Sequence, residues 1–407
     1  MKVLVSAYAC ETGRGSEGEI GWRIVHELAK QHDVTVITRA NLREVHEKAF
    51  ESTPMPPRLR FEYLDLPWIF RFYKRGKRFF LLYYYLWQIG VALRARRIMR
   101  RQDFDVLHHL TGGMDWMPSG LAFCRRPLVW GPVGSENTHP AISRYLNPTS
   151  KIRDSIRTSI RALLRTFEPL TRYTGRSAKI ILSHTPETMP RRYQDRLHAF
   201  TQTGIADLPS LAKPKSDLSR CDRLRILYAG ELKDWKGAGL ALEGALRAFE
   251  SGLEADLRVV GDGPMANEMR SVAKAHCKGG QVKLLGHMSM QELIVELHAA
   301  DVFLYPSFHH GLATVVLQAM LTALPIVCVG GDATGRTVGC RAGITVPLTS
   351  RVHPTVGIAE ALIALANNEN QRQELARAAR NIALEEFSYE ALSSRISKIY
   401  QNLSNRS

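Results

Sequence analysis

The sequence predicts an α/β protein made of two parallel β-sheets, each covered by helices on both faces. Two observations lead to this prediction. Short runs of β-branched and other apolar residues alternate with amphipathic helical stretches along the 407-residue chain, and these runs are continuously apolar, as buried parallel strands are. Residues 203–223, rich in Pro, Ser, Lys and Asp, then interrupt the series near its middle. We therefore expect two α/β domains joined by a linker.

The strands and helices can be placed in order. The first-half strands are expected at residues 2–8, 33–38, 60–66, 105–110, 127–132 and 179–184, and the second-half strands at 224–230, 256–263, 282–286, 301–307, 325–331 and 342–347. Two helices follow at the end, 370–387 and 388–403, with Ser388 a suitable N-cap for the last one. This order predicts two Rossmann-like domains, at 1–205 and 206–387, and a separate C-terminal helix at 388–407.

The composition is that of a globular protein, with 45% hydrophobic and 23% charged residues. Its six cysteines, at 10, 124, 221, 277, 328 and 340, form no C-x-x-C pair and have no histidine at zinc spacing. That usage is typical of a reducing cytoplasm and argues against a disulfide scaffold and a structural zinc. Residues 1–8 are too short for the apolar core of a signal peptide and are expected to form the first strand.

The net charge of +16 requires an anionic partner, such as a nucleic acid, a phosphorylated small molecule or a membrane surface. Residues 66–101 hold ten basic residues and no acidic one, around the fifteen-residue run 79–93, which is too short to span a bilayer as a helix. Such a basic, aromatic segment is typical of an interfacial anchor on anionic lipid. The alternative is an ordinary helix that buries Leu81, Tyr84, Trp87 and Val91. Residues 151–173 repeat the character more weakly, and no nucleic-acid-binding motif is present.

Several loops at expected strand ends are rich in glycine or lysine. Ligands of open α/β sheets bind beyond the carboxyl ends of the strands, so these loops are the candidate site. The loop at 10–22 has Gly13-x-Gly15 but lacks the rest of a dinucleotide fingerprint, so it is either a place of close ligand approach or a tightly packed turn. Lys233 and Lys236 precede a helix, where they either compensate a diphosphate or are solvated surface lysines. A glycine-bracketed turn, 259–265, follows the next strand.

Two further features involve acids and histidines. Asp103 and Asp105 form a D-x-D pair, but they lie before a strand, so their side chains should face the wrong end of the sheet for a metal-bound diphosphate. His108 and His109 lie within that strand, near its carboxyl end. Either one of them faces the cleft between the two expected domains and orients the hydroxyl of an acceptor substrate there, or both are hydrogen-bonded core histidines.

Taken together, the motifs resemble glycosyltransferase family 4, the group 1 retaining enzymes with the GT-B fold. The segments that carry the resemblance in the second half are 230–242, 259–264, 282–307, 315–327 and 385–396. In the first half, 6–22, 103–111 and 127–141 resemble a bacterial branch that builds cell-surface polysaccharides. The resemblance covers nearly the whole chain, in the right order.

The resemblance implies two facing Rossmann-like domains with a C-terminal helix that crosses back to the first. It implies a nucleotide-diphosphate sugar donor, UDP- or GDP-linked, in the second domain, and a lipid-linked or oligosaccharide acceptor in the first. It further implies a retaining, metal-independent, hexosyltransferase-like enzyme without a cofactor, in which the leaving phosphate largely deprotonates the acceptor. The setting implied is the cytoplasmic face of the membrane, with residues 66–101 on anionic lipid and no role for nucleic acid.

Three positions depart from the family pattern. Glu231 stands where the family usually has an arginine, which removes a phosphate contact unless Lys233 replaces it. His310 and Gln318 stand where the family has two acids eight positions apart, the first contacting the sugar and the second the nucleotide ribose. A glutamine can still accept a hydrogen bond from a ribose hydroxyl, although more weakly than a carboxylate. A neutral histidine at a helix N-terminus can accept one hydrogen bond.

These considerations give a set of expected site residues and two expected functions. The catalytic candidates are His108, His109, Lys236 and His310, and no metal ligand is expected. The donor-binding candidates are Gly15, Gly230, Glu231, Lys233, Lys236, Gly261, Gly263, His287, Met288, His309, His310, Gly311, Leu312, Ala313, Thr314 and Gln318. The expected function is sugar transfer in cell-surface polysaccharide synthesis. The alternative is a catalytically degenerate protein that binds a nucleotide sugar or glycan within an assembly complex.

Overall fold

The computed structural model describes most of the chain. The described residues are 1–12, 16–71, 78–135, 148–201, 203–205, 223–276, 280–308, 311–348 and 353–404. They form two compact units: unit 1 is Met1–Ser135, Arg157–Gln202 and Tyr389–Ser407, and unit 2 is Glu136–Ile156 and Thr203–Ser388. The last helix therefore belongs to unit 1, although most of unit 2 precedes it in the chain.

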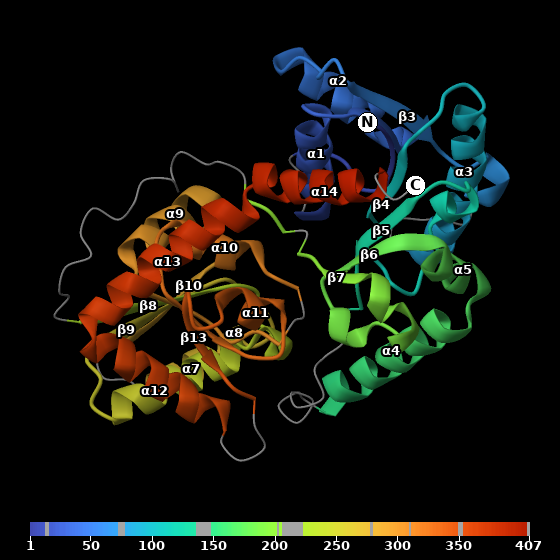
Figure 1. The fold of residues 1–407 in the computed structure, drawn as a ribbon. Helices are drawn as coiled ribbons and strands as arrows, with labels where there is room; N and C mark the ends of the chain where they lie inside the picture. Colours follow the sequence, from blue (N-terminus) through green and yellow to red (C-terminus); the bar gives the residue numbers. More distant parts are fainter. Residues whose placement is uncertain are drawn as a thin grey trace. The chain divides into compact units, whose positions relative to one another are not determined.

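Unit 1 contains a seven-stranded parallel sheet in the order β3-β2-β1-β4-β5-β6-β7. Helices lie on both faces of this sheet, with α1 and α14 packed against each other on one face and α3 on the other (Figure 1). The strands are β1 (Lys2–Ala7), β2 (Asp33–Arg39), β3 (Leu59–Leu64), β4 (Val106–Thr111), β5 (Leu128–Val133), β6 (Ala178–Ser183) and β7 (Leu197–Ala199). The helices are α1 (Ser16–Ala29), α2 (Arg43–Ser52), α3 (Phe80–Met99), α5 (Pro169–Ser177) and α14 (Tyr389–Ser404). α4 (Pro148–Phe167) is divided between the units, its residues from Arg157 onward belonging to unit 1.

Unit 2 contains a six-stranded parallel sheet in the order β10-β9-β8-β11-β12-β13. Its strands are β8 (Leu224–Ala229), β9 (Ala255–Val260), β10 (Val282–Gly286), β11 (Val302–Tyr305), β12 (Ile326–Val329) and β13 (Gly343–Val346). Its helices are α7 (Ala238–Glu250), α8 (Ala266–His276), α9 (Met290–Ala299), α10 (Thr314–Leu321), α11 (Ala333–Val338), α12 (Pro354–Asn367) and α13 (Glu369–Phe387).

The α/β class and the two parallel sheets are confirmed, and each of the expected strands is present. The main difference is β7, a short edge strand that the sequence pattern did not reveal. A second difference lies in the basic stretch 151–173, which forms two helices instead of one. Pro169 cannot continue a helix, and the Glu168 side chain accepts hydrogen bonds from the backbone N–H groups of Leu170 (3.1 Å) and Thr171 at the start of α5.

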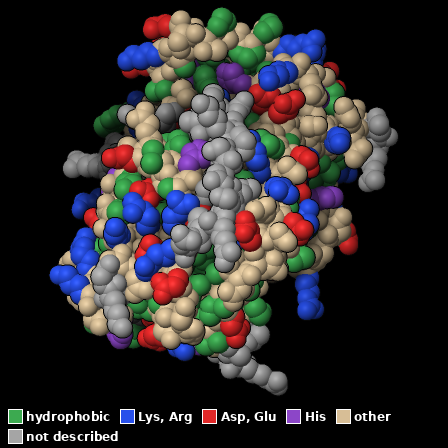
Figure 2. All heavy atoms as spheres, turned by 90° about the vertical axis from the view of Figure 1, so that its left-hand side faces the viewer, with side chains coloured by type: hydrophobic (Ala, Val, Ile, Leu, Met, Phe, Trp, Pro, Cys, Tyr) green, Lys and Arg blue, Asp and Glu red, His purple; other side chains and the backbone are tan. Residues whose placement is uncertain are grey.

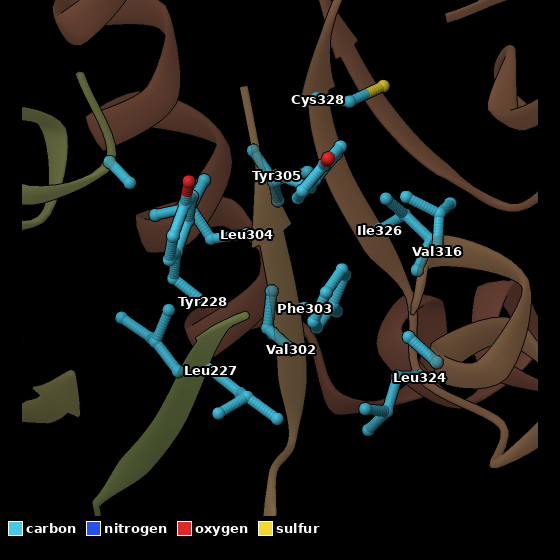
Figure 3. Close-up of a cluster of buried hydrophobic side chains, with 14 of the residues drawn as sticks. Leu227, Tyr228, Val302, Phe303, Leu304, Tyr305, Val316, Leu324, Ile326 and Cys328 are labelled. Atoms are coloured by element: carbon cyan, nitrogen blue, oxygen red, sulfur yellow. The ribbon is translucent and has the colours of Figure 1, made fainter. Parts of the chain in front are cut away.

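Each sheet is buried between its helices. In unit 2 the continuous apolar strands β8, β11 and β12 supply fully buried side chains such as Leu227, Phe303 and Ile326 (Figure 3). The four cysteines among the described residues, Cys10, Cys124, Cys328 and Cys340, form no disulfide. Apolar burial on both faces holds these strands inside the sheet. Because the strands are parallel, their carboxyl ends and the loops that follow lie at the same end of the sheet.

Candidate functional site

The loops after β8 and β11 meet at the point where the strand order of unit 2 reverses. β8 and β11 are neighbours in the sheet, but their following connections run toward opposite edges. In an open α/β sheet such a reversal leaves a crevice at the carboxyl ends of the strands, where ligands bind. Tyr228 and Tyr305, on these two strands, stack with ring centroids 6.1 Å apart and direct their hydroxyls toward the same end (Figure 3). We call this place the switch-point site.

The two loops are joined to each other by backbone contacts. The Phe308 N–H donates to the Trp235 carbonyl oxygen at 3.0 Å. Gly237 has φ of 74°, and a Cβ atom there would lie 1.9 Å from the Pro306 carbonyl oxygen, so only glycine fits. The loop that leads into α7 is therefore in direct backbone contact with the segment that follows β11. α7 begins after Gly237, and α10 begins after Ala313.

Both helices begin without a side-chain cap. The N-cap residues are Gly237 for α7 and Ala313 for α10, and neither accepts a hydrogen bond with its side chain. In α5, α9, α11, α12 and α13 the N-cap side chain accepts from a backbone N–H group, whereas α2 and α3 of unit 1 also lack such a cap. Uncapped N–H groups at the positive end of a helix are suited to binding an anion.

The two lysines of the site have different surroundings. The Lys233 Nζ lies 2.6 Å from the Glu231 carboxylate, so these two charges offset each other. Lys236 lies in a 3-10 turn, Asp234–Lys236, and its Nζ stands 4.8 Å from the centre of the Trp235 ring. The Lys233 Nζ also lies over the Trp235 ring, at 5.5 Å. Lys236 directly precedes Gly237, the N-cap of α7, so its ammonium adds positive charge beside the start of that helix.

The glycines that follow β8 and β9 allow close backbone packing. A Cβ atom on Gly261, which has φ of 130°, would lie 2.0 Å from the Gly230 carbonyl oxygen, and one on Gly263 would lie 2.5 Å from that of Leu232. The Leu232 N–H donates to the Asp262 carbonyl oxygen at 3.0 Å. These glycines hold the two loops together at the site.

The segment before and within α10 lies beside these loops. Gly311 and Thr314 are partly or fully exposed, and the buried Leu312 accepts a hydrogen bond from the Thr203 hydroxyl at 2.9 Å through its carbonyl oxygen. The Gln318 side chain is 6% exposed, and its amide nitrogen lies 3.5 Å from the sulfur of Met290. Gly15, His309 and His310 lie outside the described residues.

His287 and Met288 follow β10, at the edge of the sheet and two strands from β8. His287 is exposed, whereas Met288 is half-buried against the core of unit 2. The loop leads into α9, whose first residue, Met290, contacts Gln318 of α10. This contact is the link between the β10 loop and the switch-point site.

The structure adds Asp332, which the sequence analysis missed. Asp332 follows β12 and is 2% exposed, and its Oδ1 accepts the Gly335 N–H at 2.7 Å as the N-cap of α11. Its Oδ2 is buried without a hydrogen-bond partner in the described part of the chain. Burial raises the pKa of this carboxyl to about 7. The signal in the sequence is an aspartate between a strand and Ala-Thr-Gly, a helix-start pattern.

In unit 1, the structure corrects the expectation that His108 or His109 is exposed at a strand end. Both are buried, and burial lowers the pKa of each to about 4. His108 contacts the Gly131 carbonyl oxygen through Nε2 at 2.7 Å and the Tyr400 hydroxyl through Nδ1 at 2.5 Å. His109 contacts the Ser119 hydroxyl at 3.1 Å. Both are hydrogen-bonded core histidines.

Other polar groups occupy the carboxyl ends of β4 and β5. Asp115 is fully buried and accepts hydrogen bonds from the Ser135 hydroxyl and from Arg165, whose Nη1 lies 2.8 Å from Oδ2. The Glu17 carboxylate accepts the Gly112 N–H at 2.7 Å. No periodic pattern along the chain predicts these contacts, because their partners are far apart in the sequence.

The acids of the D-x-D pair lie at the amino end of β4, as expected. Asp103 contacts Arg126 at 2.7 Å, and Asp105 accepts the Lys2 N–H at the same distance. Both carboxylates therefore have partners within the sheet and its flanking loop.

Among the described residues of the basic segment, Phe80–Met99 form α3, which carries both apolar side chains and arginines on its exposed side. Tyr84, Trp87 and Val91 are buried, as the alternative to a membrane anchor required, whereas Leu81 and Leu93 are exposed. Among the helices of the described residues, none is both long and apolar enough to cross a membrane. On the face in Figure 2, Lys and Arg side chains are interspersed with acidic and hydrophobic ones.

Comparisons with known proteins agree with this architecture. Residues 223–368 match the family model described as group 1 glycosyl transferases. The glycogen synthase of Mycobacterium tuberculosis is 24% identical over 176 residues, which are 43% of this chain. The chain spans only 42% of the length of that relative.

Two solved structures share the fold over nearly the whole chain. WaaG, a glycosyltransferase involved in lipopolysaccharide biosynthesis, has a TM-score of 0.57 at 16% identity, with 98% of this chain and 99% of WaaG covered. Anabaena HepE in complex with UDP also has a TM-score of 0.57, at 14% identity, with 99% of this chain and 100% of HepE covered. The chain therefore has the GT-B fold that the sequence resemblance implied.

Proposed function

We propose that the protein is a glycosyltransferase that takes a sugar from a UDP- or GDP-linked donor bound at the switch-point site. The observation that carries this proposal is that the loop leading into α7, which holds Lys236, is hydrogen-bonded to the segment after β11, while α7 and α10 both begin without a side-chain cap. The match of residues 223–368 to the group 1 glycosyl transferase model supports it, since that stretch contains the whole site. HepE, which shares the fold, binds UDP.

In this proposal the diphosphate lies at the two helix N-termini, with the Lys236 ammonium beside it. Backbone N–H groups and a cation fixed in advance stabilise the charge that develops on a departing diphosphate, without rearrangement during the reaction. This arrangement lets the transfer proceed without a metal ion. Glu231 and Lys233 form a pair at 2.6 Å and add little net charge to the site.

The sugar and ribose contacts proposed are those of His310 and Gln318. The Gln318 side chain lies one turn into α10 and now contacts Met290, so ribose binding requires that contact at 3.5 Å to be exchanged. We propose a retaining transfer in which the leaving phosphate takes the acceptor proton, so that no strong protein base is needed. His108 and His109 then hold the strand β4 in place instead of acting on the acceptor, because both are buried.

The acceptor proposed is lipid-linked or an oligosaccharide, presented at the cytoplasmic face of a membrane. Trp68, Phe79 and Leu93 are exposed on the basic segment 66–101, as are Arg97 on α3 and Arg100 directly after it. Apolar and cationic side chains together bind anionic interfaces. WaaG, which shares the fold, acts in lipopolysaccharide biosynthesis.

A second function, donor binding without transfer, is favoured by two contacts. The Glu231–Lys233 pair and the Gln318–Met290 contact occupy side chains that would otherwise face a donor. In that case the protein binds a nucleotide sugar or glycan as part of an assembly complex.

Release of nucleoside diphosphate from a panel of UDP- and GDP-sugars, with and without bacterial membrane extract, separates the two functions. The transferase proposal expects release that depends on one donor and rises with extract, and a product that keeps the donor's anomeric configuration by NMR. A donor that binds in calorimetry but is never turned over under any acceptor condition would refute transfer and support the binding protein.

A further inference from the structure

Unit 1 has an apolar groove on its surface, between α3 and the segment that follows β3. One helical face of α3 forms its first wall, and the second wall comes from the segment Leu64–Pro67 and Phe70. The groove encloses about 520 Å³, within the range of roughly 300–1,000 Å³ typical of ligand sites. The lining residues are Leu64, Asp65, Leu66, Pro67, Phe70, Leu86, Ile89, Gly90, Leu93, Arg94 and Arg97.

The shape of the groove follows from the spacing along α3. Leu86, Ile89, Gly90 and Leu93 recur every three or four residues and so share one face of the helix. Gly90 has no side chain, and the nearest atoms to a Cβ there would be those of Leu64 and Leu66, at 3.4 Å. From Leu86 to Arg97 the groove extends roughly 16 Å at 1.5 Å per residue.

The walls expose apolar surface that the fold does not use. Ile89 is 43% exposed and Leu93 is 64% exposed, although α3 already buries Trp87 and Val91 on its other side. Up to Leu93, α3 therefore carries exposed apolar side chains opposite its buried ones, and such a surface indicates an apolar partner.

The charge of the groove is concentrated at the end of α3. The Arg94 Nη2 contacts Glu62 at 3.1 Å, while its Nε is buried without a hydrogen-bond partner among the described residues. Arg97 is exposed, and no ion pair joins it to another described residue. The carboxylate of Asp65 is already neutralised by Arg71 and accepts the Tyr83 hydroxyl at 2.6 Å. The groove is therefore apolar along its length and cationic at one end.

We infer that this groove binds a single-chain lipid phosphate, with the hydrocarbon chain along Leu86–Leu93 and the phosphate at Arg94 and Arg97. An apolar channel with a cationic end matches a hydrocarbon chain with an anionic head, and the exposed Arg97 guanidinium gives the phosphate hydrogen-bond donors. This inference rests on the proposed function, because it names the lipid that would carry the acceptor. It adds a defined binding site to the general affinity for anionic membranes.

The test uses the full-length protein and a diazirine-bearing farnesyl phosphate, with the labelled peptides mapped by mass spectrometry. We expect labelling at residues 64–70 and 86–93 that saturates with concentration. Gly90→Leu fills the space between α3 and Leu64, so labelling should fall at least tenfold, whereas Gly90→Ala should label nearly as wild type does. Leu93→Gln, at an exposed position that does not threaten folding, should lower labelling about fivefold.

A second variant and its matched control test whether the phosphate contributes to binding. Arg97→Gln should weaken labelling about tenfold, whereas Arg100→Gln, with the same charge change on the next turn of the chain, should not. Equal losses for the two variants would show general electrostatic attraction and overturn the inference. So would equal labelling by diazirine-bearing farnesol, or labelling spread over the whole surface of unit 1.

The readout is independent of sugar transfer. The groove variants should bind UDP as wild type does, because none of the altered residues belongs to unit 2. Saturable labelling without any turnover would leave the groove intact and refute the transferase. Turnover on a soluble saccharide without labelling would refute the groove and leave the transferase intact.

Discussion

At the scale of single residues, Lys233 and Lys236 differ in their surroundings, because Lys233 forms an ion pair with a neighbouring carboxylate. Glu231 lies 2.6 Å from the Lys233 ammonium and offsets its charge. Lys236, three residues further along, closes the 3-10 turn that leads into α7. The sequence placed both lysines at the same loop, but their unequal surroundings depend on how the turn directs each side chain, which spacing alone does not predict.

Lys236→Ala should therefore lower sugar transfer much more than Lys233→Ala. Loss of one fixed cation beside a developing anion typically costs about 10²–10³-fold in turnover, and we expect that loss in kcat/KM for Lys236→Ala. Lys233→Ala should cost less than about tenfold. Steady-state kinetics on the donor that is turned over measures both. Unchanged activity of Lys236→Ala would remove the diphosphate from this place.

The buried Asp332 predicts a stability that falls as the pH rises. Burial raises its pKa from the ordinary 3.8 to about 7, so the folded protein bears the cost of ionisation while the unfolded chain does not. This cost is absent below pH 3.8, grows up to about pH 7 and is constant above it. Asp332→Asn keeps the Oδ1 that accepts from Gly335 and removes the charge.

Asp332→Asn should accordingly be more stable than wild type by roughly 2–4 kcal/mol at pH 8 and about equal to it near pH 4. Urea unfolding at several pH values, followed by circular dichroism, measures the difference. Asp195→Asn, at an exposed position, is the control and should show no such trend. A difference for Asp332→Asn that is the same at pH 4 and pH 8 would contradict the prediction.

At the scale of elements, the sequence predicted best those whose pattern is local. The continuous apolar runs around Val36, Val259 and Val327 identify buried parallel strands, because both faces of such a strand are covered. The edge strand β7 has three residues and pairs on one side only, so it carries no such pattern. The sequence did not show which side of α3 is buried, because apolar residues lie on both sides of the helix. Only the packing in the structure shows that Trp87 is buried and Leu93 is exposed.

α14 depends on a contact that spans 292 residues. The Tyr400 hydroxyl donates to Nδ1 of His108, whose Nε2–H donates to the Gly131 carbonyl oxygen at 2.7 Å. Tyr400→Phe leaves that nitrogen buried without a donor, so the free energy of unfolding should fall by about 1–3 kcal/mol. Urea denaturation gives the value.

Tyr389→Phe is the matched control within the same helix. Tyr389 is buried, but in the described part of the chain no hydrogen bond to its hydroxyl is recorded, so the change should stay within about 0.5 kcal/mol. Equal effects of the two substitutions would show that α14 is held by apolar packing alone.

At the scale of the whole molecule, the sequence predicted the arrangement of the loops in unit 2 better than that in unit 1. Loops such as 230–237 and 306–313 follow predicted strands, and the sheet rule brings them together at the reversal between β8 and β11. In unit 1 the same rule pointed to His108 and His109, but His108 is buried against Tyr400 of α14 and Gly131 of β5, and His109 against Ser119. A segment from the far end of the chain is beyond any local pattern.

Binding of UDP or GDP should therefore protect one part of the chain from hydrogen exchange and leave another unchanged. A ligand at the switch-point site stabilises the native form by RT ln(1 + [L]/Kd), about 2.7 kcal/mol at a hundred times Kd, and the amides it contacts should slow most. Mass spectrometry of peptides covering 230–237 and 311–318 should show this slowing. Peptides covering α3 should exchange at the same rate with and without nucleotide, and Lys236→Ala should reduce the protection in unit 2. The strand order of unit 1 reverses between β1 and β4. Protection confined to unit 1 would place the nucleotide at that reversal and would refute the donor site in unit 2.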